Sequence, residues 1–206
     1  MMKASIIIVY ILLSLVYFCP IDIPYKTALP AFALVLWGIS RVPLKIVLAM
    51  FFSVIGDAMG EQGLLILQIV AFAIAHVFLI LQFMAMRHRP IIPLNKKDNL
   101  LLILLCAIVS FVIYSIALNV GDLVIQSGII IYAVVIGLMV FMALTQSVMM
   151  VKIGAVLFMA SDIILAWNIF KEAIPYSQYL IMVPYYLSQL FIFLATFEKN
   201  KCCVNK

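Results

Sequence analysis

Apolar residues run along most of this chain in long continuous stretches, and polar residues collect in the short segments between them. Because a helix of about 20 consecutive apolar residues crosses a bilayer, each stretch predicts a membrane helix. The second stretch is the shortest, and Arg41 and Pro43 follow it directly, so the second and third stretches also fit one tight hairpin. The predicted helices cover residues 4–19, 27–40, 42–60, 63–86, 100–118, 123–143, 149–168 and 177–197.

The composition supports a membrane protein. Of the 206 residues, 68% are hydrophobic and 10% are charged, whereas soluble domains contain roughly 45–50% apolar residues. So few charges and cysteines exclude a soluble globule, a disordered chain, a coiled coil, a disulfide scaffold and a nucleic-acid binder. We therefore predict an all-α bundle of eight transmembrane helices that forms a single domain over residues 1–206.

The basic residues predict the orientation of the chain. The apolar run after Lys3 resembles a signal peptide but lacks the small residues that cleavage needs, so we interpret it as the first helix. With the N-terminus inside, Lys26 and Lys171 alone of the 13 Lys and Arg residues lie outside, in agreement with the positive-inside rule. We predict a multi-pass protein with both termini in the cytoplasm. A bacterial cytoplasmic membrane is the expected location, and the endoplasmic reticulum is the alternative.

The longest polar segment, residues 87–99, carries four basic residues and two prolines. It divides the domain into two halves of four predicted helices, residues 1–86 and 100–206. We interpret the segment as a topology anchor beside anionic lipid headgroups, with binding of a substrate headgroup as the alternative. GDAMG in the third predicted helix and SDIIL in the seventh are weakly similar, which suggests two parallel repeats with a site between them.

Two carboxylates remain inside the predicted helices, Asp57 in the third and Asp162 in the seventh. A charge at the centre of a membrane helix costs roughly 2.5–3.5 kcal/mol, so such residues usually face the bundle and mark function. The two helices run in the same direction, and the aspartates lie roughly 5 Å and 9 Å below their outer ends at 1.5 Å per residue. We predict that the aspartates meet within reach of each other, and a buried structural hydrogen bond is the alternative role for each.

Small residues accompany both aspartates. Gly56 and Gly60 lie beside the aspartate of the third predicted helix, and Gly154 and Ser161 lie beside that of the seventh. Small side chains let helix backbones approach closely, so we predict tight helix contacts next to each aspartate. Bulky residues on the opposite face of the seventh helix, Met159 among them, are predicted to face lipid.

Other polar residues in the apolar stretches have two readings. His76 is either a packing residue or part of a site. Tyr186 and Gln189 in the eighth predicted helix either form structural hydrogen bonds or line a pocket. Lys26 either extends to the membrane surface or binds a phosphate. The sequence has no C-x-x-C pair, His-rich tract, Gly-rich phosphate loop or HExxH motif, so no metal or organic cofactor is predicted.

Four motifs of the predicted helices are GDAMG (56–60), AHVFLI (75–80), KIGAVLFMASDIILA (152–166) and YYLSQL (185–190). Together they resemble the YhhN family of eight-helix membrane proteins, whose animal members are lysoplasmalogenases. The most specific part is the run G-A-x-L-F-x-x-S-D-x-x-L-A, which residues 154–166 match in full. Gly60 and Leu79 stand where the family often has leucine and tyrosine, and the Lys-Pro pair of the family is split into Lys26 and Pro30.

The resemblance implies hydrolysis of the vinyl ether bond of a lysoplasmalogen, a membrane lysophospholipid, to a fatty aldehyde and a glycerophospho-alcohol. It implies Asp57 and Asp162 as the catalytic pair, with His76 and Gln189 as accessory residues.

The reaction suits these residues, because vinyl ether hydrolysis is acid catalysed and passes through an oxocarbenium ion, as glycoside hydrolysis does. Two close aspartates in a medium of low dielectric are expected to hold one proton between them. The lipid chain is expected between helices and the phosphate near Lys26 or Lys171, with Ser161 and Tyr186 as further substrate-binding candidates.

Two other functions fit the same residues. A proton-coupled transporter of a small molecule or lipid would also place carboxylates and a histidine between two repeats. Against it, the aspartates lie toward one side of the membrane, and Pro184 has no counterpart in the fourth predicted helix. In a purely structural role, the polar residues would hold helices together.

Overall fold

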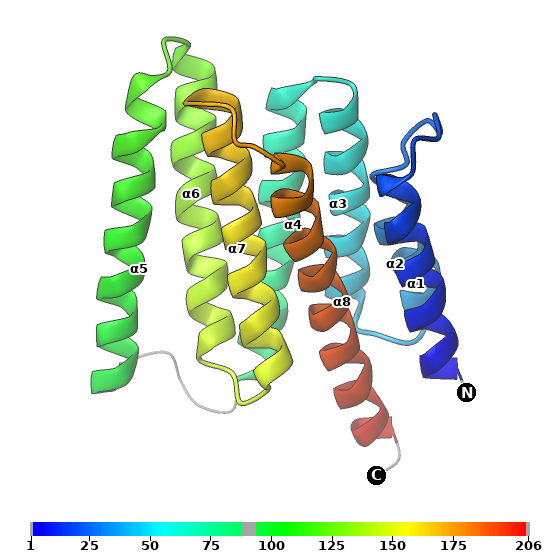
Figure 1. The fold of residues 1–206 in the computed structure, drawn as a ribbon. Coiled ribbons are helices and arrows are strands. Elements are labelled where there is room, and N and C mark those ends of the chain that lie inside the picture. The colour runs from blue at the N-terminus through cyan, green and yellow to red at the C-terminus, as the bar shows by residue number, and fades with distance from the viewer. Residues whose placement is uncertain (1, 88–93, 205–206) are drawn as a thin grey trace.

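The computed structural model describes residues 2–87 and 94–204, which are all-helical (Figure 1). The predicted all-α class is confirmed, and most helices begin and end within a few residues of the predicted positions. The described α-helices are α1 (Met2–Phe18), α2 (Leu29–Gly38), α3 (Leu44–Glu61), α4 (Leu65–Met86), α5 (Lys96–Ser115), α6 (Leu123–Leu144), α7 (Met149–Phe170) and α8 (Ser177–Val204). A short 3-10 helix, η1 (Ala117–Asn119), follows α5.

Five of the described helices are long and apolar enough to cross a membrane: α4, α5 extended through η1, α6, α7 and the Ser177–Phe197 part of α8. These five make the chain a multi-pass membrane protein by length and composition. The helices α1 and α2 are apolar but shorter. The helix α3 has 18 residues and carries Lys45, Asp57 and Glu61. Membrane crossing by α1, α2 and α3 therefore stays a prediction.

The start of α5 differs from the prediction. The Asn95 side chain accepts a hydrogen bond from the backbone N–H of Asp98 at 2.7 Å and caps the helix. As a result α5 begins at Lys96 rather than at residue 100, and the polar segment predicted for residues 87–99 is shorter. An ion pair of 3.4 Å between Arg87 and Asp98 links the end of α4 to the start of α5. Residues 88–93 of that segment lie outside the described residues.

Consecutive helices run in alternating directions, so both ends of the described chain lie at the lower end of the bundle in Figure 1. The most extensive helix contacts are α3 with α4 and α7 with α8. Contacts of α4 with α6, and of α8 with α1, α2 and α3, join the two halves. Both α3 and α7 run upward and end at the upper end of the bundle (Figure 1).

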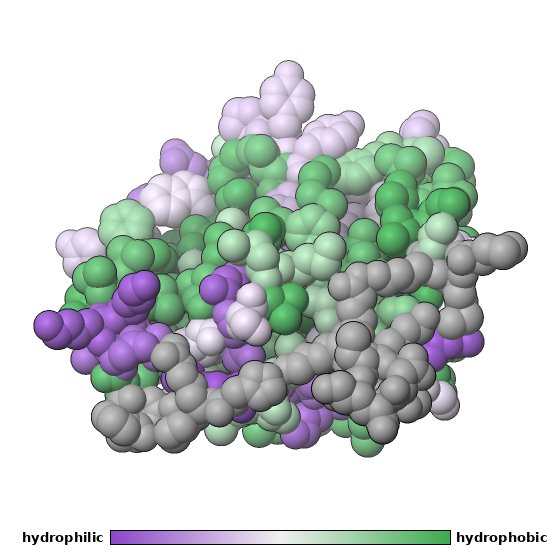
Figure 2. Space-filling view, turned by 90° about the horizontal axis from the view of Figure 1, so that it is seen from below, coloured by the Kyte–Doolittle hydropathy of each residue, from purple (hydrophilic) through white to green (hydrophobic). Residues whose placement is uncertain are grey.

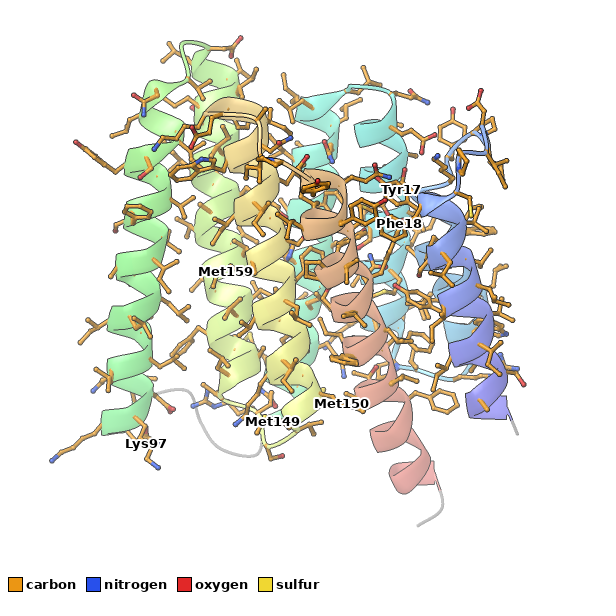
Figure 3. The ribbon with its side chains drawn as sticks, viewed as in Figure 1. Tyr17, Phe18, Lys97, Met149, Met150 and Met159 are labelled. Carbon is orange, nitrogen blue, oxygen red and sulfur yellow. The ribbon has the colours of Figure 1, made fainter. Side chains whose placement is uncertain are left out.

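Glycines lie at close helix contacts. A Cβ atom on Gly56 would lie 2.8 Å from the Phe72 ring of α4, and one on Gly154 would lie 3.0 Å from the Ser188 carbonyl oxygen of α8. The predicted tight contacts beside both aspartates are thus confirmed. The prediction that Met159 faces lipid was wrong. Met159 lies halfway along α7 (Figure 3), and its side chain is buried because other helices cover α7 on that side as well.

Charged residues gather at the lower end of the bundle. Lys97 lies at the lower end of α5 (Figure 3), and Figure 2 shows hydrophilic groups among hydrophobic ones on this end of the molecule. Lys26 and Lys171 belong to the connections at the opposite end, before α2 and after α7.

Candidate functional site

The two aspartates of the helix interiors line one cavity, here called the polar pocket, which has about 430 Å³ of empty space, including the part open to the outside. Asp57 lies one turn before the end of α3 and Asp162 two turns before the end of α7, about 6 Å and 12 Å from these ends at 1.5 Å per residue. The pocket is therefore close to the upper end of the bundle. Its walls come from α3, α4, α7 and α8, and Thr27 adds a wall from the segment before α2.

Asp57 is held by a chain of hydrogen bonds from α8. The Tyr185 hydroxyl lies 2.8 Å and 2.9 Å from the two carboxylate oxygens, and the Gln189 Nε2 donates to the Tyr185 oxygen at 2.7 Å. Because the amide N–H occupies an acceptor position of the phenol, the phenol hydrogen is directed at Asp57. Asp57 is 5% exposed and Gln189 is fully buried.

Asp162 has a separate tyrosine partner. The Tyr132 hydroxyl of α6 donates to its Oδ2 atom. The sequence did not single out Tyr132, although a buried tyrosine hydroxyl in an apolar helix usually has a hydrogen-bond partner. Each aspartate is thus oriented by a tyrosine from a neighbouring helix, α8 for Asp57 and α6 for Asp162.

His76 is not one of the residues that line the polar pocket. It is fully buried, and its Nδ1 lies 2.6 Å from the Phe72 carbonyl oxygen. Since a carbonyl oxygen only accepts, Nδ1 carries the hydrogen, and Nε2 has no partner among the described residues. The imidazole packs edge-to-face against Phe158 and Tyr132, with centroid distances of 4.6 Å and 5.4 Å. Its contacts with residues that line the cavities are those with Tyr132 and Phe72.

Of the other two candidates near the polar pocket, Ser161 lines it and Tyr186 does not. Ser161 lines the polar pocket, and its hydroxyl donates to the Ile181 carbonyl oxygen at 2.8 Å. The Tyr186 hydroxyl donates to the Thr27 carbonyl oxygen at 3.1 Å, so Tyr186 anchors a wall of the pocket. Near the same end, Tyr17 and Phe18 lie at the top of α1 (Figure 3).

The two lysines at the upper end do not line the polar pocket. Lys26 Nζ donates to the Ile21 carbonyl oxygen at 3.4 Å and lies 5.8 Å from the centroid of the Tyr17 ring. Lys171 Nζ lies 3.8 Å from the centroid of the Trp167 ring. None of the described residues lining the pocket is Lys or Arg.

Glu61 is a third carboxylate of the polar pocket, which the sequence analysis missed. It is the last residue of α3 and accepts hydrogen bonds from the Tyr25 backbone N–H at 2.6 Å and the Thr27 hydroxyl at 2.5 Å. Tyr25 has a φ of 58°, a left-handed conformation that is uncommon outside glycine. The spacing of one helical turn from Asp57 would have placed Glu61 on the same face of the helix.

A second cavity, here called the apolar groove, adjoins the polar pocket. It has about 770 Å³ of empty space, including the part open to the outside, and is lined by α4, α5, α6 and α7. Gln68, Tyr132 and Asp162 are its polar lining residues. Phe72, Leu165, Gln68 and Asp162 line both cavities, whereas Asp57 lines the polar pocket alone.

The site therefore offers carboxyl groups in a partly open, mainly apolar environment, with Asp57 buried and Glu61 exposed. Three carboxyl groups without a basic lining residue among the described ones favour a ligand or reaction intermediate with positive charge. Within residues 2–87 and 94–204, no group of three His, Cys, Asp or Glu side chains is arranged to hold a metal ion.

Comparisons with known proteins match most of the chain. The YhhN family model matches residues 23–196, a range that includes every residue lining the polar pocket. Lysoplasmalogenase TMEM86A of Bos taurus is 30% identical over 170 residues, which cover 76% of this chain and 67% of the bovine protein. No solved structure matches the chain. With the family model matched over so much of its length, the chain belongs to the YhhN family.

Proposed function

We propose that this protein hydrolyses the vinyl ether bond of a lysoplasmalogen in the membrane, releasing a fatty aldehyde and a glycerophospho-alcohol. The observation that carries the proposal is the polar pocket lined by both Asp57 and Asp162. Membership of the YhhN family and the 30% identity to a lysoplasmalogenase support the substrate class.

The reaction needs an acid and a way to stabilise a cation. Protonation of the outer alkene carbon gives an oxocarbenium ion, water adds to the carbon bonded to oxygen, and the hemiacetal breaks down to aldehyde and alcohol. One water is consumed, and each proton donated is regained. The aspartate pair supplies the proton and takes it back, and the carboxylates of the pocket stabilise the cation, as in glycoside hydrolysis.

The tyrosine partners keep the two carboxyl groups in position for this chemistry. Tyr185 and Tyr132 donate to different aspartates from different helices, so neither carboxyl group has to be ordered by the substrate. Preorganised groups of this kind lower the barrier because little reorganisation is left for the reaction itself.

In the membrane, all eight helices span the bilayer as one domain of two four-helix halves, joined by the basic segment after α4. Both termini and most basic residues face the cytoplasm of a bacterial cell, and the polar pocket faces the outer leaflet. The residue pattern that supports this orientation is the placement of Lys26 and Lys171 alone on the outer side. The substrate then reaches the pocket from the lipid phase.

The test is release of fatty aldehyde from purified protein in nanodiscs supplied with a lysoplasmalogen. The variants Asp57→Asn and Asp162→Asn are expected to lower kcat by about 10²- to 10⁴-fold, the usual contribution of general acid–base catalysis. Size-exclusion profiles and thermal unfolding confirm that each variant is folded.

An ester-linked lysophospholipid of the same chain length serves as control substrate, and it is expected to remain intact. Full activity of either folded Asn variant would contradict the proposal. Proton-driven lipid uptake without aldehyde release would identify a transporter instead.

A further inference from the structure

We infer that the apolar groove holds the hydrocarbon chain of the substrate, and that Asp162 donates the proton to the alkene carbon at the start of that chain. The inference deepens the proposed function and rests on it. It starts from the difference between the aspartates: Asp162 lines both cavities, and Asp57 lines the polar pocket alone.

The lining of the groove fits an unbranched hydrocarbon chain. Apart from Gln68, its polar lining residues are Tyr132 and Asp162, which are hydrogen-bonded to each other. A polar ligand would leave its hydrogen-bonding groups unpaired along such walls, at a considerable cost.

The groove also lies where a lipid chain has access. Its outer wall is α5, which packs mainly against α6, and large apolar side chains of α5 such as Leu104 and Phe111 are exposed. The cavity is partly open to the outside. In the membrane these surroundings are lipid, so a chain reaches the groove without passing through water.

The cavities share one end. Asp162 is three residues from Met159, the most N-terminal groove residue on α7, about 4.5 Å along the helix axis. A lipid with its chain in the groove and its ether oxygen and glycerol carbons in the polar pocket therefore has its ether linkage at Asp162. The alkene carbons belong to the chain and the ether oxygen faces Asp57.

This placement assigns the proton transfers. Asp162 gives its proton to the outer alkene carbon as the C=C electrons form the new C–H bond, which leaves an oxocarbenium ion. Water bonds to the carbon next to oxygen and loses a proton to Asp57. Asp57 then protonates the departing ether oxygen while Asp162 takes the hemiacetal hydroxyl proton. The C–O bond breaks, and both aspartates return to their starting states.

The first test narrows the groove. Ala133 lines the groove on α6, whereas the adjacent Val134 is 45% exposed on the outside of the bundle. Ala133→Phe is expected to lower the ratio of kcat/KM for an octadecenyl over an octenyl substrate by about tenfold, because the longer chain no longer fits. Val134→Phe is the matched control, and it is expected to leave that ratio unchanged.

A binding measurement keeps this test separate from the reaction. A non-hydrolysable alkyl lysophospholipid with a diazirine at the chain end is photocrosslinked to the wild-type protein, and labelled residues are expected on α5 or α6 in the groove. Labelling there without any aldehyde release would support chain binding in the groove and contradict the proposed hydrolysis. If Ala133→Phe releases aldehyde with an unchanged chain-length ratio and the labels lie elsewhere, the hydrocarbon chain does not bind in the groove.

The second test separates the two aspartates. A methyl group on the alkene carbon bonded to oxygen stabilises the cation, so such a substrate depends less on a strong acid. The increase in kcat that the methylated substrate gives over the unmethylated one is expected to be at least about tenfold larger in Asp162→Asn than in Asp57→Asn. Equal recovery, or greater recovery in Asp57→Asn, would overturn the assignment. The Glu variants at both positions serve the same comparison if an Asn variant does not fold.

Discussion

Inside a helix bundle, a carboxyl group points where its hydrogen-bond donors hold it. Asp57 accepts a hydrogen bond from the Tyr185 hydroxyl, which is itself oriented by the Gln189 amide. Asp162 accepts one from the Tyr132 hydroxyl. All three donors come from helices other than the one that carries the aspartate. The geometry of the site therefore depends on how α6 and α8 are rotated against α7 and α3.

Removing one of these donors gives a prediction at the scale of single residues. Tyr185→Phe is expected to lower kcat by about 10- to 100-fold with little change in KM, since a hydrogen bond to a charged group contributes about 1.5–3 kcal/mol. The same change leaves the Gln189 amide without its acceptor. Aldehyde release from the lysoplasmalogen is the measurement.

Tyr179→Phe is the control for this change, because Tyr179 is on the same helix and half-exposed, and it stacks on Phe18. It is expected to retain full activity. A Tyr185→Phe enzyme as fast as the wild type would show that Asp57 needs no donor.

The sequence predicted the aspartates, and it placed Tyr185 and Gln189 among the hydrogen-bonding or pocket-lining candidates of the eighth helix, but it did not show which residue pairs with which aspartate. A carboxylate in an apolar helix is costly wherever the helix points, so Asp57 and Asp162 stand out from composition alone. A tyrosine carries no such cost. Tyr185 and Tyr186 are neighbours about 100° apart on the helix, and only the packed structure determines that Tyr185 reaches an aspartate while Tyr186 reaches a backbone carbonyl.

At the scale of helices, the site depends on the close approach of α3 to α4 and of α7 to α8. Gly56 and Gly154 make this approach possible because their neighbours occupy the space of a side chain. The helix bounds were predictable since apolar stretches and helices coincide. The start of α5 was also present in the sequence, because Asn95 followed by Asp98 three residues later is a typical N-terminal capping pattern.

A methyl group at the contact of α7 with α8 tests this packing. In Gly154→Ala the new Cβ would lie 2.9 Å from the Ile192 side chain and 3.0 Å from the Ser188 carbonyl oxygen. The clash is expected to cost about 1–3 kcal/mol and lower the thermal unfolding midpoint in detergent.

Gly128→Ala in α6 is the comparison, because its Cβ would meet the Ile69 side chain at an ordinary 3.7 Å. Here the higher helix propensity of alanine is expected to stabilise the protein by up to about 1 kcal/mol. The two variants should shift the midpoint in opposite directions, and a shared direction would contradict the packing described for α7 and α8.

The connection between α1 and α2 depends on the end of α3. In Glu61→Gln, one carboxylate oxygen that accepts from this connection is replaced by an amide nitrogen, so the hydrogen bonds from Tyr25 and Thr27 are weakened. Backbone amide hydrogen exchange at Tyr25 is expected to become about tenfold faster.

Glu172→Gln is the matched control at the same end of the molecule, since Glu172 accepts from the Trp167 indole and not from this connection. Its exchange at Tyr25 should equal that of the wild type. If Glu61→Gln also exchanges at the wild-type rate, Glu61 does not hold the connection in place.

At the scale of the whole molecule, helices of alternating direction bring both described ends of the chain to one side and the polar pocket toward the other (Figure 1). The even number of predicted helices and the basic residues were sufficient to predict this arrangement. The adjoining cavities were not predictable, because a cavity arises from side chains that fail to fill the space between four helices, and no periodicity in the sequence records that.

The orientation can be tested with cysteine labelling in intact bacterial cells expressing the protein. Cys19 is exposed and follows α1 at the upper end of the bundle. With the other three cysteines replaced by serine, a membrane-impermeant maleimide is expected to label Cys19 without permeabilisation.

A second variant provides the opposite case. In a cysteine-free background, Ser147→Cys places a thiol in the exposed connection between α6 and α7 at the lower end. Labelling is expected there only after permeabilisation. The reverse pattern would place the polar pocket on the cytoplasmic side.

The meeting of an oily cavity and a polar one at Asp162 has a consequence for product traffic. Under the proposed hydrolysis, the aldehyde tail is left in the apolar groove, which is open to the lipid, and the alcohol is left in the polar pocket near the upper end of the bundle. Each fragment has its own way out, so neither must wait for the other to leave. The aldehyde would then pass sideways into the bilayer rather than into bulk solvent.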